Sequence, residues 1–532
     1  MIEEKELPKS WVWTAIGEVA DTTSGGTPSR NHPQYYGGSI PWVKSGELKD
    51  SIITTVEEFI TTEGLKNSSA KVFQQGTALV AMYGATVGKT GILGLDAATN
   101  QAICAIFPLK EAFTAKFIIY WLQFQRQNLI DRSSGGAQPN INQETVRNFP
   151  LPLAPLSEQH CIVAAIEQQF SRLDAGVAAL KRAKAKLKQY RAAVLKAAVE
   201  GKLTETWRAG HLTTEQASLL LERILKERRA KWEADLRAKG KDPAKVKYVE
   251  PAAPDVENLP GLPEGWCWAT VEQIAAAEPN SITDGPFGSN LKTEHYTSEG
   301  ARVIRLQNIG DGEFKDEKAF ITLAHFETLK KHRAFAGDLV IAALGGNPPR
   351  SCIVPDFVGP AVVKADCIRC KVFSSLLSSY INIVLNAEPT RKRTASLLHG
   401  IGRPRLNLAE IKSIVIPLPS LLEQGQIVSE VEQLLSVISQ LEVTIGANLK
   451  RAERLRQSIL REAFAGRLVP QDPTDEPASV LLERIRNESS SQKNGTGVND
   501  KKHRAVKVPE PVTLDAADTE QADLWESVGN QG

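Results

Sequence analysis

Two long segments of the chain carry an apolar residue at every seventh position. The first repeat comprises Ile166, Leu173, Leu180, Leu187 and Val194. The second repeat comprises Val431, Ile438, Ile445, Ala452 and Ile459. A seven-residue apolar repeat forms one stripe along a helix, and such a stripe packs against a partner helix. Because charged residues fill the remaining faces, we predict that the two segments pair as a coiled coil. The alternative is two ordinary amphipathic helices that pack in separate cores.

The predicted helices are long for a globular protein. The first runs from Leu156 to Leu203, which corresponds to roughly 70 Å at the rise of an α-helix. In the second helix, a companion stripe follows the seven-residue repeat at Leu434, Leu441 and Leu455. In the first helix the companion stripe is interrupted at Lys184 and Arg191. We predict that the companion positions belong to the same seam.

Outside these helices the pattern changes to short apolar runs interrupted by turn residues. The runs include GTALVAMYG (76–84), QAICAIFPL (101–109), DLVIAALGG (338–346) and CIRCKVF (367–373). Runs of this length, bounded by Gly, Pro, Asn and Asp, are typical of strands joined by loops. Prolines such as Pro152 and Pro417 end regular structure shortly before each long helix. We therefore predict two globular domains of mixed α/β structure.

The chain is an internal duplication. Three segments occur twice in the same order: 7–20 as 262–275, 148–168 as 413–433, and 217–224 as 478–485. The helical parts of the two halves match well, whereas the globular stretches match only at a few anchors. The halves therefore share a frame and differ in the part that would face a ligand. A pseudo-two-fold axis between the halves would make the long helices antiparallel.

These patterns predict an α+β fold with six segments. Two globular domains are joined by a pair of long antiparallel coiled-coil helices. The tail is polar and poor in aromatic residues, which is typical of disorder. The predicted segments are the first globular domain (1–155), a central helical region (156–238), a Pro-rich linker (239–261), the second globular domain (262–418), a C-terminal helical region (419–486) and a disordered tail (487–532).

Composition narrows the class of protein only slightly. The 532 residues correspond to about three or four structural units. The 64 Lys and Arg residues nearly balance 62 Asp and Glu residues, so the formal net charge of +2 does not by itself indicate a nucleic-acid-binding protein. The start of the chain lacks the apolar run of a signal peptide, and no stretch is long enough to span a bilayer. We expect a cytoplasmic protein that does not associate with membranes.

Two motifs resemble catalytic sites without meeting their requirements. In YGATVGKTG (83–91), only three residues separate Gly84 from Gly88, and a nucleotide-binding loop requires four. In GGNPPRS (345–351), Arg350 stands where adenine methyltransferases carry an aromatic residue that stacks on the flipped base. Neither motif has the accompanying elements of a nucleotide or cofactor site, so we predict neither activity in this chain.

The remaining candidates for chemistry are weaker. Cys367 and Cys370 form a CxxC motif without the second ligand pair that a structural zinc site needs. Acidic residues such as Glu57 and Glu58 cluster in polar segments that are typical of a solvated surface. We therefore predict no catalytic residues, no metal site and no cofactor in this chain.

Candidate DNA contacts follow from residue type and position. Phosphates attract Lys and Arg, and base edges are contacted chiefly by Arg, Lys, Asn and Gln. The first long helix holds the strongest basic cluster of any segment predicted to fold, and we select Lys181, Lys184 and Lys188 from it. These lysines could instead form a solubilising face or contact an acidic partner surface.

The other candidates lie in segments flanked by Gly or Pro, where a rigid scaffold usually presents its contacts. In the first domain they are Thr27, Ser29, Arg30, Lys44, Lys89, Gln138 and Asn140. In the second domain they are Ser289, Asn290, Lys292, Arg305, Gln307, Asn308, Arg350, Arg403 and Arg405. For each one, a role as a turn residue or surface charge is the alternative. Arg403 and Arg405, just before the second long helix, are the sharpest local prediction.

Several segments together allow a family to be recognised. The sequences PLAPLSEQHCIVAAIE (152–167) and PLPSLLEQGQIVSEVE (417–432) precede helices that end in GKL and GRL. Further segments are GGTPSR (25–30), IPWVKSGEL (40–48), ATNQAICAI (98–106), DGPFGSNL (284–291) and VIRLQNI (303–309). In order and spacing the chain resembles the specificity subunits of type I restriction–modification systems over about residues 7–486. The region 213–261 and the tail are longer than in a minimal member.

The resemblance implies a function and a set of partners. Each globular domain would be a target-recognition domain that binds one half of a bipartite, asymmetric site in double-stranded DNA. The helices would set the gap between the halves and dock two modification (methyltransferase) subunits. Those subunits would use S-adenosylmethionine, and restriction (translocase and nuclease) subunits would use ATP and Mg. This chain would itself be non-catalytic. The alternatives are a self-contained methyltransferase or endonuclease with fused recognition domains, and a coiled-coil scaffold that binds no DNA.

Overall fold

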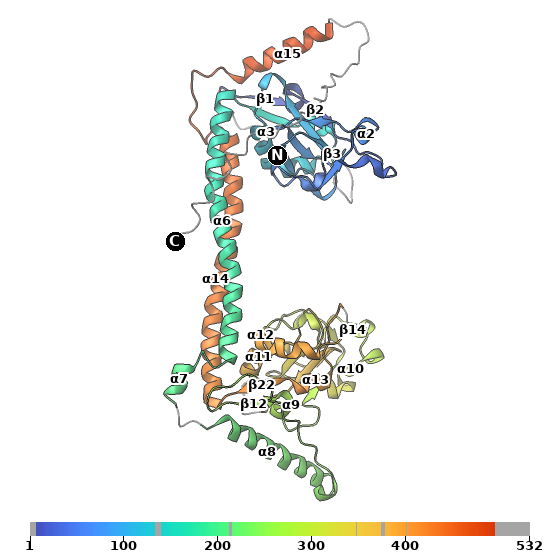
Figure 1. The fold of residues 1–532 in the computed structure, drawn as a ribbon, viewed down its shortest axis with the longest axis vertical. Helices are drawn as coiled ribbons and strands as arrows, with labels where there is room; N and C mark the ends of the chain where they lie inside the picture. Colours follow the sequence, from blue (N-terminus) through green and yellow to red (C-terminus); the bar gives the residue numbers. More distant parts are fainter. Residues whose placement is uncertain are drawn as a thin grey trace, which may run out of the picture. The chain divides into compact units, whose positions relative to one another are not determined.

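The computed structural model describes residues 7–133, 140–211, 215–346, 348–373, 378–400 and 402–494. It forms two compact units (Figure 1). The first unit combines Met1–Gln169 with Gln457–Gly532, and the second comprises Phe170–Arg456. Both divisions fall inside the long helices. The N-terminal and C-terminal parts of the chain therefore belong to the same unit.

Two larger sheets and a strand pair form the first domain. The five-stranded sheet has the order β2 (Ala20–Ser24), β10 (Ile103–Pro108), β7 (Ala78–Ala81), β8 (Thr90–Leu93), β4 (Ser51–Ile53). The four-stranded sheet has the order β5 (Glu58–Ile60), β3 (Tyr36–Val43), β9 (Ala97–Thr99), β6 (Val72–Phe73). The antiparallel pair is β1 (Val12–Ala15) with β11 (Pro150–Leu153). The helices are α1 (Ile16–Val19), α2 (Thr62–Lys66), α3 (Ala115–Phe124), α4 (Arg126–Asp131) and α5 (Gln143–Arg147).

The second domain repeats this plan with different strand lengths. Its four-stranded sheet has the order β13 (Ile282–Thr283), β21 (Cys367–Cys370), β18 (Leu339–Ala342), β19 (Arg350–Ile353). Its five-stranded sheet has the order β14 (Tyr296–Thr297), β16 (Phe320–Ile321), β15 (Ala301–Ile304), β20 (Ala361–Val363), β17 (Arg333–Ala334). The antiparallel pair is β12 (Cys267–Thr270) with β22 (Val415–Leu418). The helices are α9 (Val271–Ile274), α10 (Leu323–Thr328), α11 (Ser378–Asn386), α12 (Glu388–Thr394) and α13 (Leu408–Ser413).

The strand predictions are confirmed. Each of the four apolar runs contains a strand: β7, β10, β18 and β21. These strands are almost entirely buried, because they lie inside their sheets and not at the edges. Continuous apolar runs are typical of strands that are covered on both faces.

The two long helices form the antiparallel pair that the sequence predicts. They are α6 (Leu156–Val199) and α14 (Leu421–Phe464), each of 44 residues, and they lie side by side in Figure 1. Within the second unit, Arg191 Nη2 lies 3.5 Å from Glu442 Oε2, and Asp174 pairs with Arg456. As the residue number rises along α6, the number of the contacting residue on α14 falls, so the two helices are antiparallel. The first helix ends at Val199, four residues before the predicted Leu203.

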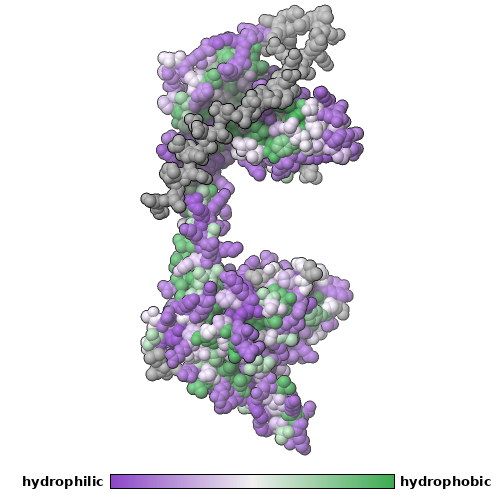
Figure 2. Space-filling view, in the orientation of Figure 1, coloured by the Kyte–Doolittle hydropathy of each residue, from purple (hydrophilic) through white to green (hydrophobic). Residues whose placement is uncertain are grey.

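The seam between the helices is narrower than predicted. Ile438 is 1% exposed and Ile445 is 8% exposed, as expected for seam positions. The companion positions Leu441 and Leu455 are 46% and 45% exposed, so their assignment to the seam is wrong. Two paired helices cover only one narrow stripe of each other, and adjoining positions stay in solvent. Figure 2 shows mainly hydrophilic residues over the helix pair, with apolar patches among them.

The ends of the helices pack into domain cores. Val194 and Val431 are 4% and 1% exposed, and they belong to one cluster with Ile416 and Leu418 of β22. The segments around Val194 and Val431 therefore pack in a domain core, as the alternative interpretation proposed. Between Asp174 and Arg191, α6 pairs with α14 as a coiled coil.

A repeated glutamate and glutamine fasten each long helix to its domain. In the first unit, Trp11 Nε1 donates to Glu158 Oε2 at 2.8 Å. In the second unit, Trp266 Nε1 donates to Glu423 Oε2 at 2.8 Å. The following glutamines, such as Gln424, donate to backbone carbonyls beneath the helix start. These bonds explain why the tryptophan and the Glu-Gln pair occur in both halves.

The two glutamates have different surroundings. Glu423 also accepts from Thr204 Oγ1 at 2.7 Å and from Arg208 Nε at 2.9 Å, so its charge is compensated. Glu158 accepts instead from the neutral Gln471 side chain at 3.0 Å. Burial raises the pKa of Glu158, and the Trp11 hydrogen bond only partly opposes that rise. The folded state therefore binds a proton at Glu158 more tightly than the unfolded chain does.

We expect the stability of the variant Glu158→Gln to change less between about pH 4.5 and pH 7 than that of the wild type, by less than about 1 kcal/mol. Because the pKa of Glu158 is raised on folding, the wild type loses stability as the pH rises from about 4.5 through the folded pKa, and Gln removes that loss. Urea unfolding from pH 4.5 to 7 measures the difference. The matched control, Glu423→Gln, should lose stability, because an amide N–H would face the Arg208 guanidinium. Equal effects of the two variants would contradict this account.

A further repeated helix covers one face of each domain. The first copy is α8 (Ala217–Ala238), whose Leu220 and Ile224 are fully buried against the second domain. The second copy is α15 (Ala478–Asn494), whose Leu482 and Ile485 are 2% and 3% exposed. The helix α15 continues eight residues beyond Arg486, into the segment predicted to be a disordered tail, so that boundary was placed too early. No helix within the described residues is long and apolar enough to cross a bilayer.

Candidate nucleic-acid interface

Each domain holds a glycine loop tightly against a neighbouring backbone. In the first domain the loop spans residues 25–30, and a Cβ at Gly25 would lie 2.2 Å from a carbonyl oxygen. In the second domain the loop spans residues 284–291, and a Cβ at Gly285 would lie 2.1 Å from a carbonyl carbon. No other residue fits at either position. The anchor is therefore part of the repeated frame, whereas the side chains that follow it differ between the domains.

A short hairpin presents Arg403 in the second domain. His399 and Arg405 exchange both of their backbone hydrogen bonds, at 3.0 and 2.9 Å. Gly400 and Gly402 adopt positive φ angles of 94° and 80°, which allow the tight reversal. Arg403 lies in this turn, is exposed, and has no ion-pair partner among the residues that the structure describes. It is therefore free to contact a ligand.

The hairpin adjoins the glycine loop of the same domain. Arg405 Nη2 lies 2.9 Å from Asp366 Oδ1, and the Arg405 guanidinium lies 5.7 Å from the centre of the Phe287 ring. A β-bridge joins Arg405 to Leu344, at the end of the run that contains β18. The structure thus brings three separate stretches of sequence to one place, which sequence spacing alone did not indicate.

The first domain has a β-bridge at the position that matches Leu344–Arg405. A β-bridge joins Tyr83 to Asn140, and the Gly84 backbone N–H donates to Asn140 Oδ1 at 3.4 Å. Asn140 follows Gln138 by two residues, as Arg405 follows Arg403. Gln138 lies outside the described residues. The glycine-rich segment 83–91 is therefore part of the loop cluster, and its Gly84–Thr86 stretch is a single 3-10 turn that leads to a strand.

Arg30 and Lys44 share one acidic cluster. Arg30 pairs with Glu58, and its guanidinium lies 4.1 Å from the centre of the Tyr36 ring. Lys44 Nζ lies 3.0 Å from Glu57 Oε2 and 3.6 Å from Glu58 Oε2. The Arg30 guanidinium holds the pKa of Glu58 below its ordinary value. Both cations are therefore oriented before any ligand binds, and a phosphate would have to compete with the carboxylates.

The other first-domain candidates are placed separately. Thr27 Oγ1 donates to the Gln101 side chain, and Ser29 is exposed in the glycine loop. Lys89 Nζ lies 3.2 Å from Asp50 Oδ2, in an ion pair that does not include the Arg30 cluster. Thr27 and Ser29 thus belong to the loop near Arg30, whereas Lys89 belongs to a second cluster.

Asn308 is a frame residue in this structure. It is fully buried, and its Nδ2 donates to the carbonyls of Lys315 (2.8 Å) and Glu317 (2.7 Å). Its Oδ1 accepts from the Arg305 backbone N–H at 2.8 Å. The side chain is buried and bonded inside the domain through both its nitrogen and its oxygen, so the geometry does not offer Asn308 to a base edge. The exposed Gln307 lies against the Arg305 guanidinium, and these two side chains remain the accessible part of the segment.

The remaining second-domain candidates line the glycine loop or a strand. Asn290 and Lys292 are exposed, and Lys292 Nζ lies 3.4 Å from Glu294 Oε1. Ser289 lies in the short 3-10 turn Gly288–Asn290. Arg350 is half-buried at the start of β19. Asn290, Lys292 and Arg350 are thus accessible at least in part.

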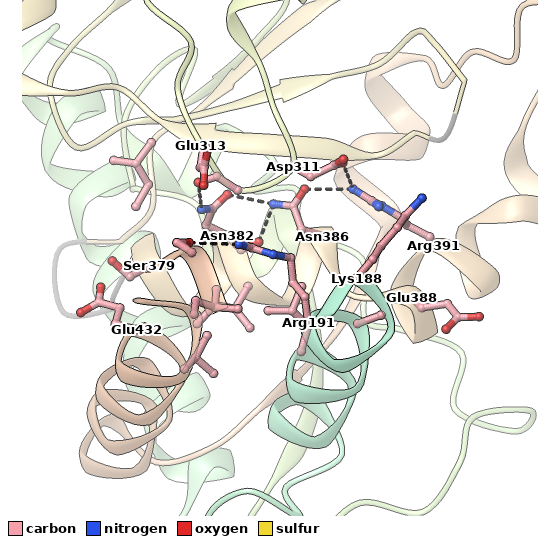
Figure 3. A pocket seen from close by; sticks show the side chains of 18 of the residues that line it. Lys188, Arg191, Asp311, Glu313, Ser379, Asn382, Asn386, Glu388, Arg391 and Glu432 are labelled. Atoms are coloured by element: carbon pink, nitrogen blue, oxygen red, sulfur yellow. Dashed lines mark hydrogen bonds and ion pairs between the residues drawn. The ribbon is translucent and has the colours of Figure 1, made fainter. Parts of the chain in front are cut away.

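The basic cluster on α6 faces solvent. Lys181, Lys184 and Lys188 are all exposed. Lys188 and Arg191 also line a cavity of about 820 Å³ among α6, α14, α11 and α12 (Figure 3). Arg191 donates to Ser439 Oγ at 3.2 Å and thereby links the two helices at the rim of this cavity. The lysines are accessible to phosphates or to an acidic partner surface.

The position of the cysteine motif disfavours metal binding. Cys367 belongs to one buried cluster and Cys370 to another, because residues three apart on a strand face opposite sides of the sheet. Burial raises the pKa of Cys370 to about 12, which disfavours the thiolate that a metal requires. Among the described residues, no group of three or more His, Cys, Asp or Glu side chains is placed to hold a metal ion.

Sequence reasoning missed the acidic partners of the candidate cations. Asp50 and Asp366 pair with Lys89 and Arg405, and both have positive φ angles, of 61° and 67°. Aspartate adopts the left-handed region more readily than most residues. Each Asp ends a turn directly before a strand, Asp50 before β4 and Asp366 before β21. The spacing of residues in the sequence could not predict these ion pairs, because the paired residues come from distant segments.

The fold is thus that of a protein with two globular domains that share a frame, differ in their loops and are attached to long helices. The family model described as "Type I restriction modification DNA specificity domain" matches residues 8–189 and 367–451. The chain therefore belongs to this family, whose members recognise DNA targets and are non-catalytic subunits of type I restriction enzymes.

Individual relatives agree with the family. The chain is 23% identical over 516 residues to the type I restriction enzyme EcoKI specificity subunit of Escherichia coli strain K12, covering 91% of this chain and 97% of that protein. It is 24% identical over 410 residues to the EcoBI specificity subunit of Escherichia coli, covering 74% and 75%. A chain in a solved structure of a type I R-M system has the same fold, with a TM-score of 0.62, 18% identity, and coverage of 87% of this chain and all of that one.

Proposed function

We propose that this chain recognises a bipartite, asymmetric target in double-stranded DNA, with one half-site for each globular domain. The observation that carries the proposal is a β-bridge that occurs at matching positions of both domains, Tyr83–Asn140 and Leu344–Arg405, with different side chains. Arg403 and Arg405 stand in the second domain where Gln138 and Asn140 stand in the first. Arginine favours contacts with guanine, whereas glutamine and asparagine favour contacts with adenine. Two domains with the same backbone frame and these different side chains would therefore bind half-sites of different sequence.

We further propose that the chain works in a complex with two modification subunits and with restriction subunits. S-adenosylmethionine, ATP and Mg would act in those partners. Because the ligand of this chain would be host or invading DNA, we propose that the complex acts in the cytoplasm.

The helix pair would determine the spacing between the half-sites. This proposal rests on the continuity of α6 and α14, each an uninterrupted helix of 44 residues. A dimeric or pseudo-dimeric DNA-binding protein matches the separation of its two heads to the helical repeat of the duplex. The lysines on α6 would add contacts to phosphates or to a partner subunit.

The test begins with the complex of this chain and its modification subunit. Sequencing of methylated adenines in the host genome should give a split motif, and binding to that motif should exceed binding to random duplexes in a salt-sensitive manner. Methylation by this chain alone with S-adenosylmethionine would show a self-contained enzyme. Failure of the complex to retain any DNA would favour a scaffold.

Arg403→Ala should weaken binding to the target by about 10- to 100-fold, corresponding to one lost contact of an arginine with a base, and should relax selectivity at one position of one half-site. The complex is titrated with duplexes that differ at single positions. Arg237→Ala on α8 is the matched control: Arg237 is exposed and lies outside the loop cluster, so its loss should leave affinity and selectivity unchanged. An equal effect of the two substitutions would contradict a role for the hairpin.

A further inference from the structure

A basic cavity adjoins the loop cluster of the second domain. It has a volume of about 630 Å³. Its lining includes two lysines and three histidines: Lys330, Lys331, His295, His325 and His332. These residues come from the short turns Thr293–His295 and Lys330–His332 and from α10, which lies between them in the sequence. None of them belongs to the candidate contacts derived from the sequence.

The charge of this cavity is not compensated from within. Its one acidic lining residue, Glu327, lies 2.6 Å from Arg333 Nη2 and is thereby neutralised. Lys330 and Lys331 are exposed, and neither has an ion-pair partner in the described part of the chain. Two ammonium groups at the mouth of one cavity suit a ligand with concentrated negative charge.

The histidines are oriented by the backbone. His295 Nδ1 accepts from the Lys292 backbone N–H at 3.1 Å, so the proton of the neutral ring lies on Nε2. Nε2 is 3.9 Å from Glu294 Oε1, which is beyond hydrogen-bonding distance. The His295 ring also packs on the His325 ring, with centroids 4.5 Å apart. His295 therefore keeps an unused N–H donor on a ring whose position is fixed.

Two hydrogen bonds connect the cavity to the glycine loop. His325 Nε2 lies 2.9 Å from the Asn290 carbonyl oxygen, and His332 Nδ1 lies 2.5 Å from the Asp284 carbonyl oxygen. Asp284 and Asn290 lie in the loop 284–291, which contacts the arginine hairpin through Phe287. A ligand in the cavity would thus adjoin the surface proposed to contact bases.

The basic groups are not needed by the repeated frame. The helix α2 of the first domain is capped by Thr61 as α10 is capped by Thr322, so the two helices occupy equivalent places. After α2 the chain continues with Asn67, Ser68 and Ser69, which are uncharged. When Thr61 is aligned with Thr322, Ser69 and Ala70 match Lys330 and Lys331, and the stretch 67–71 has no 3-10 turn like Lys330–His332. The two lysines are therefore a feature of the second domain alone.

We propose that this cavity binds a backbone phosphate of the DNA duplex beside the half-site contacted by the second domain. Lys330 and Lys331 supply charge, and His295 supplies a neutral donor. Phosphate contacts fix the register of a protein on DNA without specifying bases. The inference rests on the proposed function and adds an asymmetry to it: the second domain is clamped to the backbone at a site that the first domain lacks.

The experiment uses the complex with the modification subunit, and the target obtained from adenine mapping. Lys330→Gln combined with Lys331→Gln should reduce the slope of log affinity against log salt by about 0.9 for one phosphate, and up to about 1.8 for two. Target and random duplexes should weaken by the same factor. Lys239→Gln with Lys241→Gln, two exposed lysines at the end of α8, makes the same charge change away from the cavity and should leave the slope unchanged.

Duplexes with a single neutral methylphosphonate locate the contact. The wild type should lose affinity when one particular phosphate is neutralised, and the double lysine variant should be insensitive at that phosphate alone. His295→Phe, which keeps an aromatic ring against His325, should weaken the same contact.

Three outcomes would overturn the inference. The first is an unchanged slope in a complex that still prefers its target, which leaves the proposed function intact. The second is a loss of base selectivity without a change in slope. The third is binding of inorganic phosphate that does not compete with DNA. A wild-type complex that binds no DNA would instead refute the proposed function itself.

Discussion

Inserting seven residues into each long helix is expected to lower the affinity of the complex for its original target by at least about 1,000-fold, the usual margin between specific and non-specific binding. Seven residues add about 10 Å of helix, which corresponds to about 3 base pairs at roughly 3.4 Å per pair. Two half-sites at the original spacing would then no longer meet both domains together. The preferred spacer of the extended protein should therefore differ from the original spacer.

The insertions belong after Lys181 in α6 and after Lys450 in α14. Both points lie between the Arg191–Glu442 and Asp174–Arg456 contacts, where the helices pair with each other and not with a domain core. A seven-residue insertion preserves the apolar repeat, so the seam remains intact.

A library of targets with graded spacers measures the effect. As a control, seven residues inserted beside Gly240, an exposed glycine with a φ of 70°, should leave the preferred spacer unchanged. If the doubly extended protein kept its original spacer, the helices would not set the spacing.

Phe464→Ala is expected to lower the free energy of unfolding by about 3 to 5 kcal/mol, the usual cost of removing a buried aromatic side chain. Phe464 is the last residue of α14, and it is 5% exposed within the first unit. Its ring centre lies 5.1 Å from that of Trp121 and 5.2 Å from that of Phe117. Edge-to-face contacts of this kind add to the loss of buried area.

Urea unfolding followed by tryptophan fluorescence measures this loss, because Trp121 reports on the packing that changes. Leu455→Ala on the same helix is the control, since Leu455 is 45% exposed and its truncation should cost less than about 0.5 kcal/mol. A loss below about 0.5 kcal/mol in Phe464→Ala, equal to that of the control, would mean that Phe464 does not complete the core of the first unit.

The predicted elements were confirmed where the signal was local and repeated. The seven-residue stripe predicted two long helices. Their attachment through the Trp11–Glu158 and Trp266–Glu423 hydrogen bonds emerged only from the structure. The companion stripe failed at Leu441 because the pattern of apolar residues cannot say how much of a helix its partner covers.

The candidate contacts show a similar division. Residue type and neighbouring glycines selected Arg403, whose exposure in a closed turn agrees with a contact role, but the same criteria selected Asn308, which is buried. An asparagine side chain can hydrogen-bond the backbone of its own loop as readily as a base. Only the positions of the surrounding carbonyl groups distinguish the two roles. The basic cavity was missed because His295 and Lys330 are far apart in the sequence.

The sequence by itself determined that this protein has two related halves, a pair of long antiparallel helices and two unlike globular domains, because periodicity and repetition are properties of the order of residues. Only the tertiary structure decided which side chains meet: the loop junctions, the acidic partner of each cation and the basic cavity beside the second glycine loop. Those contacts join residues from distant segments, and their energies depend on distance and burial, which the order of residues does not contain.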